Sequence, residues 1–284
     1  MIGAIEAGGT KFVCAVLDDN SVLDRVTIPT AEPETTMNAV YQFFEKYDVE
    51  AVGIGAFGPI NLDRNSANYG MIQNTPKLEW QYYPLLNEVQ KAMKRPVAID
   101  TDVNTASLGE YHFGSAKRQD SCLYITVGTG IGGGFVKNGD SYIGQNHPEM
   151  GHVFINQMND DGFIGICPSH GSCLEGLVSG PAIEKRMKQK AVTISANDPL
   201  WETIAYYIAQ ALVNYTLVLS PAKIVIGGGV MKQMQLYPLI KESFTALMNG
   251  YIKIDDIDQF IVPPELNDDQ GILGAAVIAK EIIA

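Results

Sequence analysis

The chain is poor in positive charge. Its 284 residues include 20 lysines and arginines against 32 aspartates and glutamates, which gives a formal net charge of −12 and a pI of about 4.7. A surface of this sign repels both the phosphates of nucleic acids and anionic lipid, so we expect neither a nucleic acid nor a membrane as a partner. An anionic ligand would have to be bound by local clusters of backbone amides or together with a metal ion.

Long apolar runs are missing as well. The most apolar stretch, 204–219, is interrupted by Gln210 and Asn214. It therefore stays below the roughly 20 apolar residues that a membrane span requires. The first residues show no basic segment followed by an apolar one, which is the pattern of a secretory signal. We expect a cytoplasmic protein in which 204–219 forms a buried helix.

Cysteine and histidine are scarce, with four residues of each. Cys14 and Cys122 lie in apolar runs and are expected to be unreactive core residues. The other two cysteines and three of the four histidines fall within 147–173. In a cytoplasmic chain this clustering indicates a metal site, and four nitrogen and sulfur ligands complete the tetrahedral shell of a structural zinc ion. The alternative is two free thiols with two unrelated histidines. The predicted zinc ligands are His152, Cys167, His170 and Cys173.

Glycine, by contrast, is abundant, with 28 residues that are often clustered. The first cluster lies in 7–11, between two runs that are typical of β-strands. Consecutive glycines leave their amide hydrogens uncovered, and a nest of amides binds phosphate. The spacing is not that of a Walker A loop, and a tight hairpin without a ligand is the alternative. The residues predicted to bind phosphate here are Gly8, Gly9, Thr10 and Lys11.

The second cluster, 128–134, has five glycines in seven residues and follows an apolar strand directly. It resembles the dinucleotide fingerprint G-x-G-x-x-G, but a Rossmann turn opens a helix. Here Phe135 and Val136 are typical of a returning strand, so we favour a phosphate-binding hairpin over the loop of a dehydrogenase. The residues predicted to bind phosphate here are Gly128, Thr129, Gly130, Gly132 and Gly133.

The segment 100–104 places carboxylates at the end of a buried strand. A carboxylate in such a position can act as the general base that takes the proton of an attacking hydroxyl in phosphoryl transfer. The alternative is that one of the two aspartates caps the helix predicted over 104–109. We assign the chemistry to Asp102 and a supporting role to Asp100.

Two further carboxylates, Glu149 and Glu175, lie on either side of the predicted zinc loop. Ionised carboxylates accept hydrogen bonds from sugar hydroxyls. A lone glutamate is usually a solvated surface side chain, but two of them around a rigid metal loop favour a sugar-binding site.

The pattern of strand, glycine turn and strand occurs twice, in 1–18 and in 121–136, which indicates a weak internal duplication. Periodicity predicts helices over 35–47, 84–93, 201–219 and 271–283, and strands over 51–57, 97–99 and 223–226.

We expect two α/β lobes with a ligand-binding cleft between them. The N-terminal lobe, 1–118, contains the first phosphate motif and Asp102, and the C-terminal helix of about 271–284 packs back on it. The C-terminal lobe, 119–270, contains the second phosphate motif and the zinc loop. The boundary falls in the polar stretch 115–120.

Together these motifs resemble the ROK family of sugar kinases, in its bacterial fructokinase branch, over nearly the whole chain. The resemblance rests on 6–11, on 128–133, on 149–152 with the Cys-His-Cys loop, and on the turn at 226–230. It implies a duplicated actin/hexokinase-like (ribonuclease H-like) α/β fold. It also implies ATP and Mg²⁺ as cofactors, Zn²⁺ as a structural ion, and a homodimer.

The resemblance also implies roles for residues. Asp102 matches the catalytic base, and the implied reaction is phosphorylation of a hexose at its 6-hydroxyl, with D-fructose as the sugar. The alternatives are a mannokinase or glucokinase of the same family, or a sugar-sensing regulator without catalysis. The residues matched to the sugar side are Gly58, Pro59, Asn74, Thr75, Asn104, Glu149, His152 and Glu175, and Gly228 and Gly229 match the turn near the adenosine.

Three positions depart from the family pattern. Glu6 stands where the first motif usually has aspartate, and its longer side chain would shift a contact to a metal-bound water. Thr101 stands before Asp102 where glucokinases of the family have asparagine, which argues against glucose. His170 stands where much of the family has cysteine, and imidazole binds zinc equally well.

Overall fold

The computed structural model describes residues 1–284, and their contacts divide the chain into two compact units. Unit 1 comprises Met1–Arg118, Gly134–Pro148 and Glu265–Ala284, and unit 2 comprises Gln119–Gly133 and Glu149–Pro264. The lobes expected from the sequence differ from these units at 134–148 and at 265–270, which belong to unit 1.

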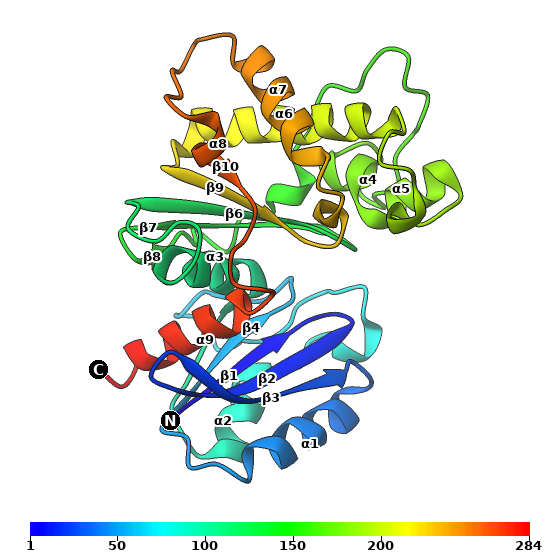
Figure 1. Ribbon diagram of the computed structural model, residues 1–284. Coiled ribbons are helices and arrows are strands. Elements are labelled where there is room, and N and C mark those ends of the chain that lie inside the picture. The colour runs from blue at the N-terminus through cyan, green and yellow to red at the C-terminus, as the bar shows by residue number, and fades with distance from the viewer. The chain divides into compact units, whose positions relative to one another are not determined.

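Unit 1 is built on a five-stranded mixed sheet with the strand order β3-β2-β1-β4-β5 (Figure 1). β1, β2 and β3 are antiparallel neighbours, whereas β1, β4 and β5 run parallel. The first two strands are joined by the first glycine turn (8–10). The strands are β1 Ile2–Ala7, β2 Lys11–Asp18, β3 Ser21–Pro29, β4 Ala51–Ala56 and β5 Val97–Thr101.

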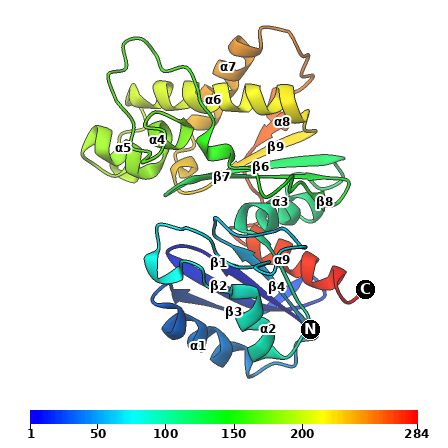
Figure 2. The ribbon, with the colours of Figure 1, turned by 180° about the vertical axis from the view of Figure 1, so that it is seen from behind.

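Helices cover both faces of this sheet, with α1 and α2 on one side and α3 and α9 on the other (Figures 1 and 2). Because side chains alternate along a strand, Ile5 and Ala7 join the core under α1 and α2, whereas Ile2 and Ala4 join the core under α9. Strands that are buried on both faces need continuous apolar runs, as in β2. The helices are α1 Pro33–Phe44, α2 Leu85–Met93, α3 Asp102–His112 and α9 Gln270–Glu281.

The second sheet has five strands in the order β10-β9-β6-β7-β8. β6, β9 and β10 are parallel neighbours, and the second glycine turn (128–130) joins β6 to β7, as the first turn joins β1 to β2. The strands are β6 Ser121–Val127, β7 Ile131–Lys137, β8 Asp140–Ser141, β9 Lys223–Gly227 and β10 Ile261–Val262.

The helices of unit 2 are dominated by α6 and α7, which pack against each other (Figures 1 and 2). No helix of the protein combines the length and apolar character needed to cross a membrane. The helices are α4 Leu174–Val178, α5 Gly180–Met187, α6 Leu200–Leu219, α7 Leu236–Met248 and α8 Ile257–Phe260. Short 3₁₀ turns occupy Leu78–Trp80, Met150–His152, Ala191–Thr193 and Val230–Lys232.

The α/β class and the elements predicted by periodicity are confirmed, but the returning strand of the second hairpin starts earlier than expected. β7 begins at Ile131, so the last three glycines of the cluster lie within a strand. A Cβ atom on Gly133 would lie 2.6 Å from Met150 Sδ and 2.7 Å from Ile125 Cδ1. A side chain at this position would have to displace Met150 and Ile125, which approach the strand closely.

Helix α9 lies unusually near its neighbours because glycines stand at the contact points. A Cβ atom on Gly53 of β4 would lie 1.8 Å from the carbonyl oxygen of Ala275. A Cβ atom on Gly274 would lie 1.7 Å from the carbonyl oxygen of Thr105 in α3. Neither position has room for a side chain, so these glycines set the distance between α9, the sheet and α3.

Replacing Gly274 by alanine should lower the free energy of unfolding by about 2 kcal/mol. The clash with the α3 backbone outweighs the gain in helix propensity of about 1 kcal/mol. Urea unfolding followed by circular dichroism measures the change. Gly162→Ala is the matched control, since a Cβ atom at Gly162 meets nothing within 4 Å. Equal stability of the two variants would contradict the close packing of α9.

Candidate active site and metal centre

Three of the predicted segments in unit 1 meet at one edge of its sheet. β1, β4 and β5 are parallel, and Ala7 pairs with Ala56, which in turn pairs with Thr101. The three strands therefore end side by side. β1 leads into the first glycine turn, β4 into 57–59 and β5 into Asp102. Ligands of open α/β sheets bind beyond these carboxyl ends of the strands.

Asp102 is the first residue of α3 and is half-buried. The helix is capped by Thr101, whose Oγ1 accepts a hydrogen bond from Asn104 N at 3.1 Å. The alternative that one of the aspartates caps this helix is therefore wrong. Asp102 Oδ1 accepts a hydrogen bond from Val103 N at 2.9 Å, which orients the carboxylate at the start of the helix.

Asp100 and Asn104 form a buried pair next to Asp102 in the chain. Asp100 Oδ1 accepts hydrogen bonds from Thr101 N and from Asn104 Nδ2, both at 2.7 Å. Burial raises the pKa of the Asp100 carboxyl, and these hydrogen bonds oppose the shift. The amide of Asn104, predicted to bind sugar, is thus directed at Asp100. The pair stabilises the turn that carries Asp102.

The first glycine turn is held closed by backbone contacts. Gly8 N donates a hydrogen bond to Lys11 O at 3.0 Å, and Thr30 Oγ1 donates one to Gly8 O at 2.7 Å. A Cβ atom on Gly8 would lie 2.7 Å from Lys11 O, whereas one on Gly9 would meet nothing within 4 Å. The turn requires glycine at its first position, and the side chains of Thr10 and Lys11 are exposed beside it.

Glu6 points to the side of the sheet that α9 covers. A Cβ atom on Gly271 would lie 2.6 Å from Glu6 Oε2, so the glycine at the start of α9 makes room for this carboxylate. Burial raises the pKa of Glu6, and the nearby charges of Lys11 and Arg25 oppose the shift. The glutamate that departs from the family pattern is therefore accommodated by the helix that packs on it.

The residues predicted to line the sugar side of unit 1 are brought together by short contacts. Gln73 N donates a hydrogen bond to Pro59 O at 2.7 Å. Gln81 Nε2 donates to Asn74 Oδ1 and to Thr75 O, both at 2.9 Å, and Thr75 is buried. The segments 58–59 and 73–75 thus form one surface.

In unit 2 the second glycine turn lies beside the turn that follows β9. β6 and β9 pair in parallel with Thr126 opposite Gly227, so both strands end at the same edge. A Cβ atom on Gly128 would lie 3.8 Å from Gly229 N, and Gly228 has a φ of +96° that favours glycine. The two segments predicted to bind the nucleotide are neighbours. Thr129 is exposed, Gly130 and Gly132 are half-buried, and Gly133 is buried.

The four predicted metal ligands gather at one point of unit 2, with their ligand atoms within 4.8 Å of one another. Nδ1 of His152 lies 3.6 Å from the Sγ atoms of Cys167 and Cys173, and Nδ1 of His170 lies 3.7 Å from Cys167 Sγ. Zinc bonds of about 2.0–2.3 Å give ligand separations of roughly 3.5 Å in a tetrahedron. The donor set and its spacing therefore fit a zinc ion. Burial raises the pKa of the Cys173 thiol to about 11, so metal binding there would release a proton.

The loop between the first and second predicted ligands, His152 and Cys167, has a further anchor. Sequence reasoning missed it, because its members are far apart in the chain. Arg186 donates hydrogen bonds to both carboxylate oxygens of Asp161, at 2.5 and 3.0 Å, and Tyr207 donates one at 2.6 Å. The guanidinium also stacks on Phe163, 4.2 Å from the ring centre. Burial opposes ionisation, but these donors hold the pKa of Asp161 below its usual range.

The two carboxylates predicted to bind sugar flank the predicted metal ligand His152 differently. Glu149 is exposed, and its carbonyl oxygen accepts a hydrogen bond from His152 N at 3.0 Å. Glu175 Oε1 lies 3.9 Å from His152 Nε2, and Glu175 Oε2 accepts a hydrogen bond from Ile131 N at 2.8 Å. Glu175 thus touches both the metal site and the end of the second glycine turn.

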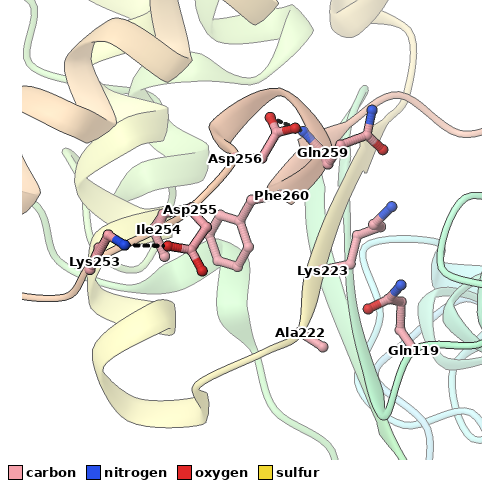
Figure 3. A pocket seen from close by; sticks show the side chains of 9 residues that line it. All are labelled: Gln119, Ala222, Lys223, Lys253, Ile254, Asp255, Asp256, Gln259 and Phe260. Atoms are coloured by element: carbon pink, nitrogen blue, oxygen red, sulfur yellow. Dashed lines mark hydrogen bonds and ion pairs between the residues drawn. The ribbon is translucent and has the colours of Figure 1, made fainter.

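A separate hollow of about 450 Å³ lies on unit 2 and contains none of the predicted site residues (Figure 3). It is found where β9 begins, at Lys223, and so at the opposite end of this strand from Gly228. An ion pair of 2.7 Å between Lys253 and Asp255 crosses one side of it, and the ring of Phe260 faces it (Figure 3). The predicted chemistry does not depend on this hollow.

Comparison with known proteins identifies the family. The ROK family model matches residues 2–282. A relative from Bacillus subtilis (strain 168) is 49% identical over 288 residues, covering 100% of this chain and 96% of its own. A protein from Pediococcus pentosaceus named fructokinase is 43% identical over 281 residues, covering 99% of this chain and 98% of its own.

A solved structure agrees with these relatives. The ROK family glucokinase from Streptomyces griseus, in complex with glucose and AMPPNP, is 25% identical and superposes with a TM-score of 0.78 over 99% of each chain. The predicted two-lobed, hexokinase-like fold is confirmed by this likeness. With the family model matched almost from end to end, this chain belongs to the ROK family.

Proposed function

We propose that this protein is a fructokinase that transfers the γ-phosphoryl group of ATP to the 6-hydroxyl of D-fructose. The observation that carries the proposal is the position of Asp102 in register with the first glycine turn and with 57–59 at one sheet edge. Transfer of a phosphoryl group to an alcohol needs a positioned base and donors for the phosphate oxygens. The 43% identity to a protein named fructokinase supports fructose as the sugar.

Asp102 orients the 6-hydroxyl and takes its proton as the oxygen attacks the γ-phosphorus. Backbone amides of the two glycine turns donate hydrogen bonds to phosphate oxygens and stabilise the charge of the transferring group. Gly228 and Gly229 lie against the adenosine. Mg²⁺ bound to ATP would neutralise charge on the phosphates, and phosphate oxygens and water, the ligands this ion prefers, would supply most of its coordination.

The sugar hydroxyls are bound in unit 2 by Glu149, His152 and Glu175, and in unit 1 by 58–59, by 73–75 and by Asn104. A zinc ion on His152, Cys167, His170 and Cys173 would fix the loop that carries the sugar ligands. With four protein ligands it has no open position, so its role is structural.

We also propose that the enzyme is a cytoplasmic homodimer, on the strength of the family resemblance. Light scattering coupled to size exclusion should then give about twice the chain mass of 30.9 kDa.

A coupled assay of ADP release with ATP and Mg²⁺ across fructose, mannose and glucose should show the highest kcat/KM with fructose. The threonine before Asp102 removes the amide that glucokinases of the family present to the sugar. A higher kcat/KM with glucose or mannose would make the protein a glucokinase or mannokinase instead.

Asp102→Asn should lower kcat by roughly 10²–10⁴-fold, because the amide cannot accept the proton of the attacking hydroxyl. Fructose affinity, measured by calorimetry, should change little. Asp120→Asn replaces an exposed aspartate and is the matched control. Near-normal turnover of the Asp102 variant would show that another group is the base.

Protein purified without chelators should contain about one zinc ion per chain by mass spectrometry of the metal. Cys173→Ser should lose the metal and lower the melting temperature, since the loop loses its fixed point. Cys122→Ala removes a buried thiol outside the cluster and should retain zinc. A zinc-free wild-type protein with titratable thiols would rule out the metal site.

A further inference from the structure

Glu175 uses its two carboxylate oxygens for different partners. It follows Cys173 by two residues, in the first turn of α4. Oε2 accepts the hydrogen bond from Ile131 N at 2.8 Å, and Oε1 lies 3.9 Å from His152 Nε2. Because His152 turns Nδ1 toward the two cysteine sulfurs, Nε2 is the nitrogen left to face Glu175. The 3.9 Å separation is too long for a hydrogen bond, but a carboxylate facing the second ring nitrogen of a metal ligand is a common arrangement.

The second glycine turn makes further contacts with 149–180, the segment that contains all four predicted metal ligands. Gly180 N donates a hydrogen bond to Gly128 O at 2.7 Å, at the start of the turn. Gly151 packs on the other end, where a Cβ atom would lie 1.9 Å from Ile131 O. A Cβ atom on Gly130 would lie 2.8 Å from Glu175 Oε2, so the turn fits closely around this carboxylate.

A glycine-rich turn of this kind loses much conformational freedom when it is ordered. A turn that is already held in its binding conformation binds phosphate more tightly, because it loses less conformational entropy when the ligand binds. Among the contacts that hold this turn, the bond from Ile131 N to a carboxylate is the charge-assisted one, and such bonds are stronger than bonds between neutral groups.

We infer that Glu175 is a positioning residue for the nucleotide as well as a sugar ligand: its bond to Ile131 N holds the second glycine turn in the conformation that binds phosphate. The inference rests on the proposed function. It joins the sugar-binding and metal-binding segment to the nucleotide site inside unit 2. A ligand that fixes Glu175 should then favour nucleotide binding, and the nucleotide should favour that ligand by the same factor.

The test is calorimetry with a non-hydrolysable ATP analogue and Mg²⁺ in the absence of sugar. Glu175→Ala should raise the Kd of the analogue by about tenfold. This is the lower end of the range expected for the loss of a hydrogen bond to a charged group. Glu175→Gln should give a smaller increase, since the amide oxygen still accepts the bond from Ile131 N. Glu149→Ala is the matched control: it removes the other carboxylate assigned to sugar and should leave this Kd unchanged.

The rate of amide hydrogen exchange in the peptide that contains Ile131 tests the same bond without a ligand. Exchange should be faster in Glu175→Ala and Glu175→Gln than in the wild type and in Glu149→Ala. If the wild type binds the analogue and the Glu175 variants bind it equally well, the inference is wrong while the proposed function stands. If the wild type binds no analogue at all, the proposed function fails.

Discussion

Parallel strand pairing in register is the constraint on which the candidate site depends. β1, β4 and β5 are covered by helices on both faces, so a slip of one residue would move each side chain from its own core into the core on the opposite face. The register that the two cores impose sets Ala7, Ala56 and Thr101 side by side. Asp102 and the first glycine turn are therefore neighbours because the two cores on the faces of the sheet fix the register of the strands that precede them.

Local signals were enough to predict much of this protein. The glycine clusters, the candidate metal ligands and Asp102 are recognisable within short stretches, and the structure brings the four candidate ligands together as their spacing indicates. The strand β3 is not among the predicted elements, because it is an edge strand with mostly exposed residues and lacks clear alternation. Helix α7 is also absent from the prediction, although Leu236, Ile240, Phe244 and Met248 recur at helical spacing and could have revealed it.

The rest depends on contacts between distant residues, which a single sequence does not report. β7 begins at Ile131, and Gly133 within it packs closely against the side chain of Met150. The cap of α3 is Thr101 and not an aspartate, because Asp100 is turned inward to Asn104. The anchor of Asp161 on Arg186 and Tyr207 joins a loop to two helices, and none of the three stands in a recognisable motif.

The packing of α9 has a consequence for the order in which the chain can fold. The face of the first sheet that carries Ile2 and Ala4 is completed by residues from 265–284, which follow all of unit 2 in the chain. Unit 2 ends at Pro264, so all its residues are synthesised before the segment 265–284 that completes the core of unit 1. During translation the usual order, in which the N-terminal part folds first, is therefore reversed for this half of the core. The face of the sheet that carries Ile2 and Ala4 stays uncovered until α9 has left the ribosome.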